Sequence, residues 1–488
     1  MKREKIPLLL LLAVLLAAFF LVQLPHLNNA PWEYYDSWRQ TDTYTLAQNF
    51  VRYDGNPLHP QFNYDGTGDN FVQLELQILP WLASLIYRII GDDPYWVMRL
   101  MSLLCFLGSA VFVYALGGRM LKTPWAGLAA AAVYLVLPIN VLYGRAIMPE
   151  SVALLFYTGA VWFFLRWYEE DKTPSLLVSA AFMAIAIMEK TPTAFAGLMI
   201  VVLYFVKCRT KTFRDWRFYT YGVISLGIPL LYYWVAAQIA TFTFVEGIAE
   251  NHIFTKMFTA LFTPEAKQFF DTQLPYFFTW PAVFAAVVGL ILCLWRRREA
   301  LFLWAIAMIL EAATIVAVIR LGYYLIFLSP LVALLTAAWV PELARFRKAG
   351  YAAAAVVVCA VAAFAGWNSL ETAKTVVVVK DTITQQAEII KSVTAEGDCV
   401  AIAASDPVLL GACERMGYRA NIRYYDYIPT EPAAELDYYR SQGVRWFIAP
   451  SGQVAGQDGE AYMQLLRDTC KTVWDDELCT IFDLEAAK

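Results

Sequence analysis

The 488-residue chain has few charged residues and almost no histidine. Asp, Glu, Lys and Arg make up 16% of it, and its three histidines (His26, His59 and His252) do not share a metal-ligand spacing. It contains no phosphate-binding P-loop, no nucleophile elbow and no Cys-x-x-Cys pair, so a metallohydrolase or an ATPase has no support. Acidic and basic side chains must therefore carry any chemistry.

Long apolar runs are abundant instead. Hydrophobic residues make up 59% of the chain and the mean hydropathy is +0.49, which indicates a polytopic membrane protein. The first run follows a basic N-terminus without a convincing cleavage site and is predicted to be a retained signal anchor. Eleven spans are predicted, at 6–24, 97–117, 125–142, 151–167, 175–189, 193–207, 218–236, 276–295, 300–319, 321–340 and 350–367.

The distribution of Lys and Arg orients these spans. Basic clusters near 119–122, 207–217, 296–298 and 345–348 all fall on the cytoplasmic side only if segment 71–90 does not cross. In that segment Gln73, Gln77, Ser84 and Arg88 share one helical sector, as in an amphipathic helix at the interface. Loops 25–96 and 237–275 and the tail are then outside. We predict a multi-pass membrane protein whose polar loops and tail lie on the extracytoplasmic side.

The last 121 residues have a different character. Predicted helices near 384–393, 408–416 and 431–442 alternate with strands near 399–404 and 444–449, which favours a small α/β domain. The sequence therefore predicts a mainly α fold, with a transmembrane domain at 1–367 and a periplasmic domain at 368–488. The four cysteines of the tail permit two disulfides or none, and Cys470–Cys479 is the favoured pair.

Several charged residues cluster on the predicted outer face. Asp36 and Asp42 lie in the first outer loop, and Arg145, Glu150, Lys190 and Arg320 lie where predicted spans reach the same side. Cations there suit a lipid phosphate, and a carboxylate suits proton abstraction from an acceptor hydroxyl. The alternatives are interfacial snorkelling for each cation and a helix-capping role for Asp42.

Several short motifs carry a family resemblance over residues 1–340. Trp38-Arg-Gln-Thr-Asp-Thr43 followed by Leu46-Ala-Gln-Asn-Phe50 resembles the first-loop motif of bacterial GT-C glycosyltransferases. The chain is in this respect similar to protein O-mannosyltransferases and lipid A aminoarabinose transferases (glycosyltransferase families 39 and 83). The other segments that resemble this group are Glu75-Leu-Gln-Ile-Leu-Pro-Trp-Leu82, Met98-Arg-Leu-Met-Ser-Leu-Leu104, Gly118-Arg-Met-Leu121, Met188-Glu-Lys-Thr-Pro192 and Tyr323-Tyr-Leu-Ile-Phe-Leu-Ser-Pro330.

This resemblance implies an inverting transferase that takes a sugar from a polyprenyl-phosphate carrier on the periplasmic face of a bacterial inner membrane and needs no nucleotide sugar. A first-loop acid serves as base or acceptor-positioning group in the family. Relatives with Asp-Glu in this loop place the acid about one turn before Asp42, where this chain has Arg39, so Asp42 and Asp36 are both candidates, with Asp42 first. Glu150 matches a second acidic position, and Lys190 matches a lysine near the carrier phosphate. A further lysine of some relatives is absent at Val72-Gln73, where Arg145 or Arg320 is expected to substitute. The expected catalytic residues are Asp42, Asp36 and Glu150, and the expected substrate-binding residues are Lys190, Arg145, Arg320, Tyr323, Tyr324, Arg39 and Glu75.

Two other functions compete with the transferase. A transporter or flippase of a lipid-linked envelope intermediate would typically show inverted repeats and mid-membrane charges, and the sequence shows neither. An assembly protein similar to an O-antigen ligase is the second alternative. The expected partners are a polyprenyl-phosphate-sugar donor, a lipid, glycan or protein acceptor and the membrane, without nucleic acid. No cofactor is required by the sequence, which is compatible with a divalent cation or with none.

Overall fold

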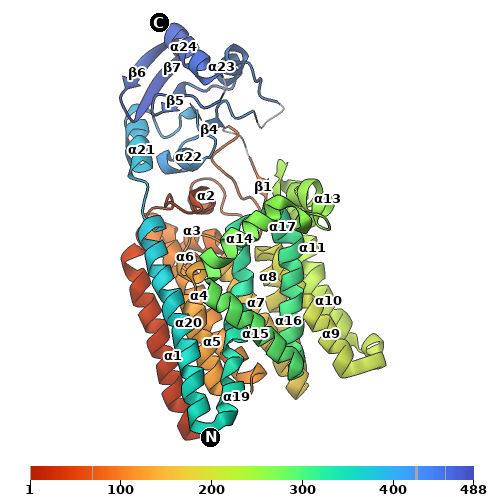
Figure 1. The fold of residues 1–488 in the computed structure, drawn as a ribbon. Coiled ribbons are helices and arrows are strands. Elements are labelled where there is room, and N and C mark those ends of the chain that lie inside the picture. The colour runs from red at the N-terminus through yellow and green to blue at the C-terminus, as the bar shows by residue number, and fades with distance from the viewer. Residues whose placement is uncertain (1, 67, 69, 424–426, 457, 488) are drawn as a thin grey trace.

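The computed structural model describes residues 2–66, 68, 70–423, 427–456 and 458–487. A body of long helices forms one end of the molecule, and a small sheet domain made by the C-terminal part of the chain stands on the other end (Figure 1). The first helix and the last long helix, α1 (Lys2–Gln23) and α20 (Arg347–Val376), run side by side along one edge of the body. The fold is thus a membrane-type helical bundle with a C-terminal α/β domain.

Each predicted span has a helical counterpart. Among the described residues, six helices are long and apolar enough to cross a membrane, or seven if one bent pair counts as a span. These are fewer than the eleven predicted spans, because several counterparts are shorter apolar helices or helices joined by a break. Besides α1 and α20, the counterparts of the predicted spans are α4 (Tyr95–Met120), α5 (Pro124–Val136) with α6 (Pro138–Tyr143), α7 (Glu150–Glu170), α8 (Thr173–Glu189), α9 (Ala196–Cys208), α10 (Trp216–Gly222) with α11 (Ile228–Ile239), α15 (Trp280–Trp295), α16 (Glu299–Glu311) with α17 (Ala317–Ile319), and α18 (Ser329–Ala337) with α19 (Trp339–Leu343).

Two predicted boundaries are wrong. The span predicted to begin at 276 begins at Trp280, because Thr279 takes φ 64° and bends the chain by 97° between α14 (Pro264–Phe278) and α15. Helix α20 continues nine residues past the predicted end at 367, to Val376. The polar end does not stop this helix, because Glu371 and Lys374 are compatible with helix at exposed positions and buried Ser369 donates to the carbonyls of Ala365 and Val136.

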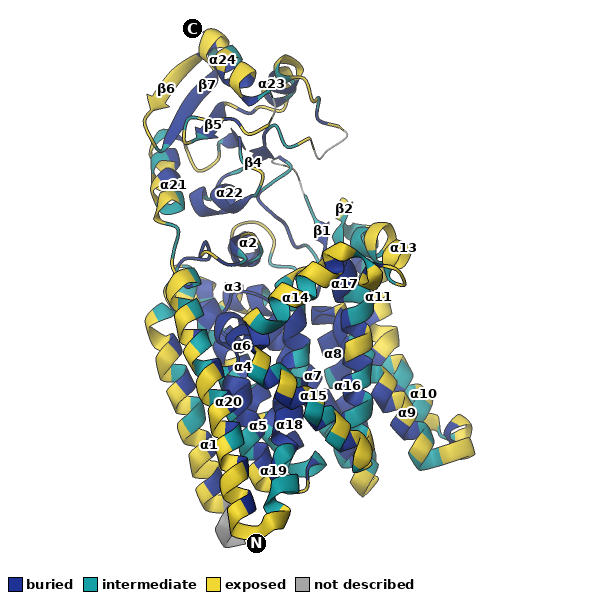
Figure 2. Ribbon diagram, in the orientation of Figure 1, coloured by how far each residue is buried: buried dark blue, intermediate teal, exposed yellow. Residues whose placement is uncertain are grey.

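The interfacial segment is only partly helical. Helix α3 spans Ile78–Ile90, while Val72–Gln73 form strand β1, which pairs in parallel with β2 (Phe242–Thr243) and ties the two outer loops together. Ser84 is buried against the protein, and Ile89 is 85% exposed. Leu82, Leu85 and Ile89 thus form an exposed apolar face, as the amphipathic pattern predicts, while Leu79 and Ala83 pack into the protein. Most of α3 is buried in the view of Figure 2.

The C-terminal domain contains a five-stranded mixed sheet in the order β4-β3-β5-β7-β6. The alternation predicted from sequence is present, and the structure adds β4, α24 and the terminal hairpin, which the sequence reading missed. The elements are α21 (Asp381–Val393), β3 (Cys399–Ile402), α22 (Val408–Cys413), β4 (Met416–Arg419), α23 (Pro432–Ser441), β5 (Trp446–Pro450), α24 (Gly459–Thr469), β6 (Cys470–Asp475) and β7 (Cys479–Ala487).

The favoured disulfide is wrong, since all eight cysteines are free. Cys470 begins β6 and pairs with Ala487, whereas Cys479 begins β7 and pairs with Pro450. The first residues of two consecutive antiparallel strands lie at opposite ends of their hairpin. The two cysteines therefore lie too far apart for the disulfide that the turn between them predicted.

The C-terminal domain rests on helix α2 (Ser37–Arg52), which lies across the top of the bundle. Gly411 permits this contact: a Cβ there would lie 2.4 Å from Thr41 Cγ2. The Lys380 ammonium donates to Ser37 Oγ at 2.9 Å, and the Trp32 indole donates to Thr384 Oγ1 at 2.9 Å. These contacts fix the first outer loop between the two parts of the protein.

Candidate active site

Lys190 is the centre of a buried charge cluster at the end of the bundle that carries the C-terminal domain. Its ammonium lies 3.0 Å from Glu75 Oε1 and 3.0 Å from Glu150 Oε1, and the residue is only 2% exposed. The rings of Tyr323 and Tyr324 face the same ammonium, with centroids at 5.3 and 5.0 Å. Glu75, Glu150 and the two tyrosines therefore surround Lys190, and the five residues come from four separate segments of the chain.

Local structure explains how these side chains converge. Helix α8 ends at Glu189, and Lys190 follows it in extended conformation with φ −153°. Glu150 begins α7, where a carboxylate is favoured by the positive end of the helix dipole. Tyr323 and Tyr324 belong to the 3-10 turn η8 (Gly322–Leu328) before α18. Two helix ends and one turn thus meet at the same height in the bundle.

Arg39 extends the cluster toward the first outer loop. Its guanidinium donates to Glu75 Oε2 at 2.9 Å, so that Glu75 joins Arg39 and Lys190. Burial alone would raise the pKa of Glu75, but the Arg39 and Lys190 charges lower the pKa to about 2. Glu75 is therefore an anion that holds two cations in place.

The cluster retains unused hydrogen-bonding capacity among the described residues. Arg39 Nε is buried and has no hydrogen-bond partner, and an ammonium such as Lys190 has three protons for two carboxylates. Glu150 is fully buried, and neither of its carboxylate oxygens accepts a hydrogen bond of normal geometry, although Oε1 lies close to the Lys190 ammonium. Unsatisfied buried donors beside two cations are what an anionic ligand would engage.

Asp36 borders this cluster. It caps the N-terminus of α2 in a left-handed conformation (φ 42°, ψ 37°), which is strained for a residue other than glycine. Its Oδ2 accepts a 2.6 Å hydrogen bond from Tyr143, whose ring centroid lies 6.3 Å from that of Tyr323. Burial raises the pKa of Asp36, the Tyr143 hydrogen bond opposes the rise, and the Glu150 charge adds to it. One tyrosine therefore separates Asp36 from the rings that face Lys190.

Asp42 lies one and a half turns further along α2, beside the C-terminal domain. It is 7% exposed, and hydrogen bonds join it to Trp38 and Tyr64. Burial raises the pKa of Asp42 to about 7, although the Arg39 and Arg419 charges oppose the rise. The guanidinium of Arg419 lies over the rings of both Trp38 and Tyr64. Asp42 is thus part of the contact between α2 and the C-terminal domain.

This raised pKa predicts a dependence of stability on pH. A carboxyl whose pKa rises from 3.8 to about 7 on folding stabilises the native state below pH 4, and this contribution is lost as the pH rises to 7. At pH 8 the free energy of unfolding of Asp42→Asn should therefore exceed that of the parent by up to roughly 4 kcal/mol, and the variant should unfold at a higher temperature. At pH 4 the variant should gain little. Thermal unfolding at both pH values measures this. The exposed Asp271→Asn is the matched control, and an equal gain at both pH values would contradict the prediction.

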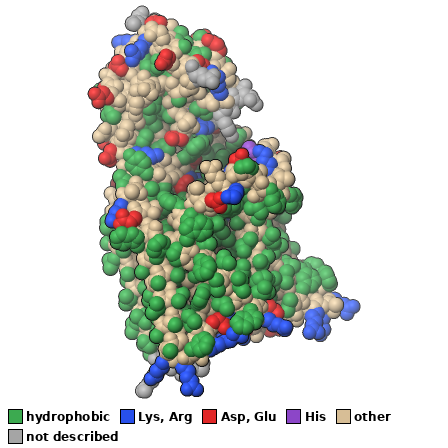
Figure 3. All heavy atoms as spheres, in the orientation of Figure 1, with side chains coloured by type: hydrophobic (Ala, Val, Ile, Leu, Met, Phe, Trp, Pro, Cys, Tyr) green, Lys and Arg blue, Asp and Glu red, His purple; other side chains and the backbone are tan. Residues whose placement is uncertain are grey.

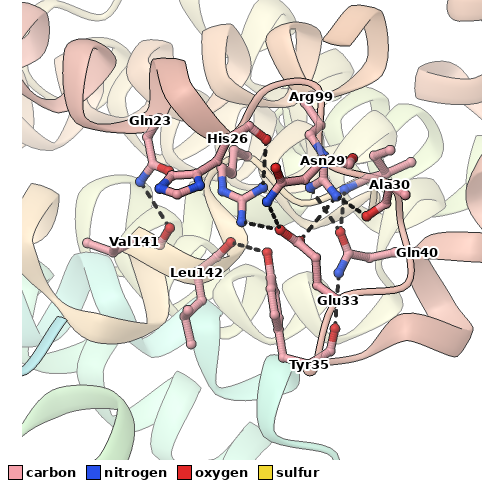
Figure 4. Close-up of polar contacts among 12 residues, drawn as sticks. Gln23, His26, Asn29, Ala30, Glu33, Tyr35, Gln40, Arg99, Val141 and Leu142 are labelled. Carbon is pink, nitrogen blue, oxygen red and sulfur yellow. Dashed lines mark hydrogen bonds and ion pairs between the residues drawn. The ribbon is translucent and has the colours of Figure 1, made fainter. Parts of the chain in front are cut away.

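Arg145 belongs to a second, separate cluster. Its guanidinium donates to Glu33 Oε1 at 2.8 Å, and Arg99 donates to Glu33 Oε2 at 3.1 Å, with all three residues fully buried. Arg99 also donates to the Asn29 carbonyl, and Asn29 donates to Glu33 (Figure 4). This network fastens the chain after α1 to α4 and to the turn before α7. The structure therefore gives Arg145 a carboxylate partner away from Lys190.

Arg320 is exposed, in a left-handed conformation (φ 52°) after α17. Among the described residues, its side chain donates only to the carbonyl of Ala317. Sequence reasoning missed Glu33, Arg99 and Tyr143, which complete the two clusters, and Glu189, which is fully buried and accepts from the Ile78 amide at 3.3 Å. The available signal for Glu189 was its position beside Lys190 at the end of an apolar run. Within the described residues, no three His, Cys, Asp or Glu side chains gather as a metal site would need.

A groove of about 810 Å³ lies between the C-terminal domain and the outer loops. The molecule is hollowed at this level in Figure 3. Tyr418, Tyr427 and Tyr438 line it from the domain, and Phe62 and Tyr64 line it from the first loop. Phe242, which begins β2, and Phe244, just after β2, line it from the second loop. The remaining described side chains that line the groove are mostly neutral and polar, and none of them is Lys or Arg. Aromatic rings among amide and hydroxyl groups are suited to a partly apolar, uncharged ligand.

Comparisons with known proteins agree with this architecture. Residues 78–234 match the family model of dolichyl-phosphate-mannose-protein mannosyltransferases. No curated protein matches the sequence.

Solved structures match over nearly the whole chain. The apo structure of ArnT from Cupriavidus metallidurans is 15% identical, with 96% of this chain and 97% of that chain covered and a TM-score of 0.65; ArnT has also been solved bound to undecaprenyl phosphate. The archaeal oligosaccharyltransferase AglB from Archaeoglobus fulgidus, in complex with an inhibitory peptide and a dolichol-phosphate, is 11% identical, with 92% and 70% covered and a TM-score of 0.62. The mycobacterial arabinofuranosyltransferase AftD is 14% identical, with 97% and 40% covered and a TM-score of 0.53. The protein is therefore a multi-pass membrane protein with the ArnT-like GT-C glycosyltransferase fold, and its residues 78–234 match the dolichyl-phosphate-mannose-protein mannosyltransferase model.

Proposed function

We propose that this protein transfers a sugar from a polyprenyl-phosphate carrier to an acceptor at the outer face of a bacterial inner membrane, with inversion and without a nucleotide sugar. The observation that carries the proposal is the pairing of buried Lys190 and half-buried Arg39 with one carboxylate, that of Glu75, at the end of an apolar bundle and beside Asp36. The buried Arg39 Nε has no hydrogen-bond partner among the described residues. Carrier phosphates bound to ArnT and AglB support the same class of donor.

Lys190 and Arg39 hold the carrier phosphate in this proposal. Both cations already share Glu75, so the phosphate binds to their remaining donors, assisted by the hydroxyl groups of Tyr323 and Tyr324. Arg145 and Arg320, which the sequence reading placed at the phosphate, are left out because one pairs with Glu33 and the other is exposed.

Asp36 is the proposed base, ahead of Asp42. In the transfer, the acceptor hydroxyl oxygen bonds to the sugar C1 while the bond from C1 to the phosphate oxygen breaks. The polyprenyl phosphate leaves as a stable anion, so one carboxylate that takes the hydroxyl proton is sufficient. Asp36 has one oxygen bonded to Tyr143 and Oδ1 left to accept this proton, whereas Asp42 faces Tyr64 and Trp38. Glu150 is expected to orient Lys190.

The charge distribution supports an outer location for this site. Lys and Arg gather at the end of the body opposite the C-terminal domain (Figure 3), and basic loops stay on the cytoplasmic side of a membrane. The C-terminal domain and the Lys190 cluster are then periplasmic.

The aromatic groove is the proposed entry of the acceptor. If it binds acceptor, Tyr438→Ala should raise the acceptor KM about tenfold and leave the donor KM unchanged, because an aromatic contact contributes on the order of 1 kcal/mol or more to a bound ligand. Steady-state kinetics with each substrate varied in turn measures the two constants. Trp474→Ala, an exposed aromatic on β6 that does not line the groove, is the control. An equal rise in both KM values would argue against a role in acceptor binding.

The experiment that tests the function is a turnover assay of the purified protein against a panel of polyprenyl-phosphate sugars with lipid, glycan and peptide acceptors. Release of polyprenyl phosphate that depends on an acceptor would establish the class. A protein that moves such lipids across vesicle membranes without releasing polyprenyl phosphate would instead be a flippase.

A further inference from the structure

A second polar pocket lies at the basic end of the body, opposite the proposed active site. It encloses about 420 Å³ between the ends of α4, α7 and α9, the turn from α15 to α16, and Arg345. Six cationic side chains line it, together with two acids, Glu169 and Glu299. The cations are Arg119, Lys122, Arg296, Arg297, Arg298 and Arg345.

Ion pairs account for four of these cations. Arg119 pairs with Glu169 at 3.0 Å and with Glu170 at 3.1 Å. Arg296, Arg298 and Arg345 share a single carboxylate, that of Glu342, at 2.9, 2.8 and 3.3 Å.

The remaining charges leave an excess of positive charge. Lys122 and Arg297 form no ion pair among the described residues. Six cations and two acids line the pocket, and Glu342 adds a third acid. Glu170 contributes at most a fourth, because it is shared with Arg166 and Lys172. The pocket therefore keeps an excess of at least two positive charges. One side chain nitrogen, Arg119 Nη1, is buried without a hydrogen-bond partner.

The pocket is built at the level of lipid headgroups. Its floor is made of the buried side chains of Leu165, Leu203 and Leu301, while the cations form its rim. Trp295 and Phe346, directly beside Arg296 and Arg347 in the chain, are 70% and 73% exposed. Exposed aromatic residues next to a basic cluster mark the interface of a membrane, where a basic pocket between helices suits a lipid phosphate.

We propose that this pocket binds the phosphate-bearing headgroup of an anionic phospholipid, with Lys122 and Arg297 as its principal contacts. A headgroup with two phosphates, as in cardiolipin, would neutralise two of these positive charges. The proposal concerns a site at the other end of the bundle and does not depend on the proposed sugar transfer.

The backbone offers a variant that is expected to fold. Lys122 and Arg297 have φ values of 57° and 51°, a left-handed conformation that glycine adopts at lower cost. Lys122→Gly with Arg297→Gly therefore removes two charges without straining the chain. Lys211→Ala with Arg214→Ala is the matched control, because it removes two exposed cations from the turn between α9 and α10 at the same end of the body.

Native mass spectrometry of the full chain, titrated with cardiolipin, phosphatidylcholine or inorganic phosphate, tests the proposal. Each cation near a lipid phosphate contributes about a factor of five in affinity, so the glycine pair should bind cardiolipin about 25-fold more weakly. The control pair should bind like the parent, and phosphatidylcholine should bind weakly to all three. Equal cardiolipin affinity in the parent and the glycine pair would overturn the site. Binding of inorganic phosphate with this variant pattern, without cardiolipin binding, would keep an anion site and overturn the lipid.

Discussion

Asp36→Asn should reduce turnover by about 10²–10⁴ and leave donor binding nearly unchanged, because the amide keeps the shape of the carboxylate and loses its basicity. The variant retains an oxygen for the Tyr143 hydroxyl, which limits any structural effect. Rates with saturating donor and acceptor, together with binding of an unreactive polyprenyl phosphate, separate catalysis from binding. The raised pKa of Asp36 also predicts that activity in the parent falls on the acid side at a higher pH than an ordinary aspartate would allow.

Asp42→Asn is the matched comparison for this test. It changes the same group on the same helix, but it lies against Trp38 and Tyr64 beside the C-terminal domain. We expect near-parental turnover at neutral pH. If Asp42→Asn loses turnover and Asp36→Asn keeps it, the order of the two bases is reversed; if both keep it, Glu150 becomes the candidate.

Lys190→Ala should weaken use of the donor by about 10²–10³, as loss of a buried group that stabilises an anion typically does. Removing this ammonium also leaves Glu75 and Glu150 with one cation fewer in a buried site, which costs stability. Donor KM and kcat are therefore measured on protein shown to be folded by its thermal transition. Lys190→Arg should restore activity only in part, because a planar fork replaces a point charge between two carboxylates.

Arg145→Ala separates this effect from a general loss of buried charge. Arg145 is as deeply buried as Lys190 and also pairs with a carboxylate, but its partner is Glu33 in the cluster that fastens the first outer loop. We expect a lower yield of folded protein and a donor KM close to that of the parent in the fraction that folds. An unchanged donor KM in Lys190→Ala would reduce Lys190 to a structural residue.

The long apolar runs, their order and the end of the bundle at which the site charges gather were readable from the sequence, because a membrane span needs about 20 apolar residues whatever its neighbours are. The amphipathic pattern around Ser84 and Ile89 likewise indicated the interfacial helix, since periodicity is a local property. The association of Lys190, Glu150 and Tyr323 on one face was also predicted, since each lies at the end of a predicted span.

Pairing within that face was decided by tertiary structure alone. Arg145 and Lys190 are both cations at the outer ends of apolar helices, and only packing assigns Glu33 to one and Glu75 to the other. The same holds for Asp36 and Asp42, because the turn into α2 directs the first toward Tyr143 while the C-terminal domain covers the second. Cys470 and Cys479 stay apart because strand order places them at opposite ends of a hairpin. Contacts between segments far apart in the chain depend on which surfaces bury each other, and hydrophobic periodicity, which is local, does not contain that information.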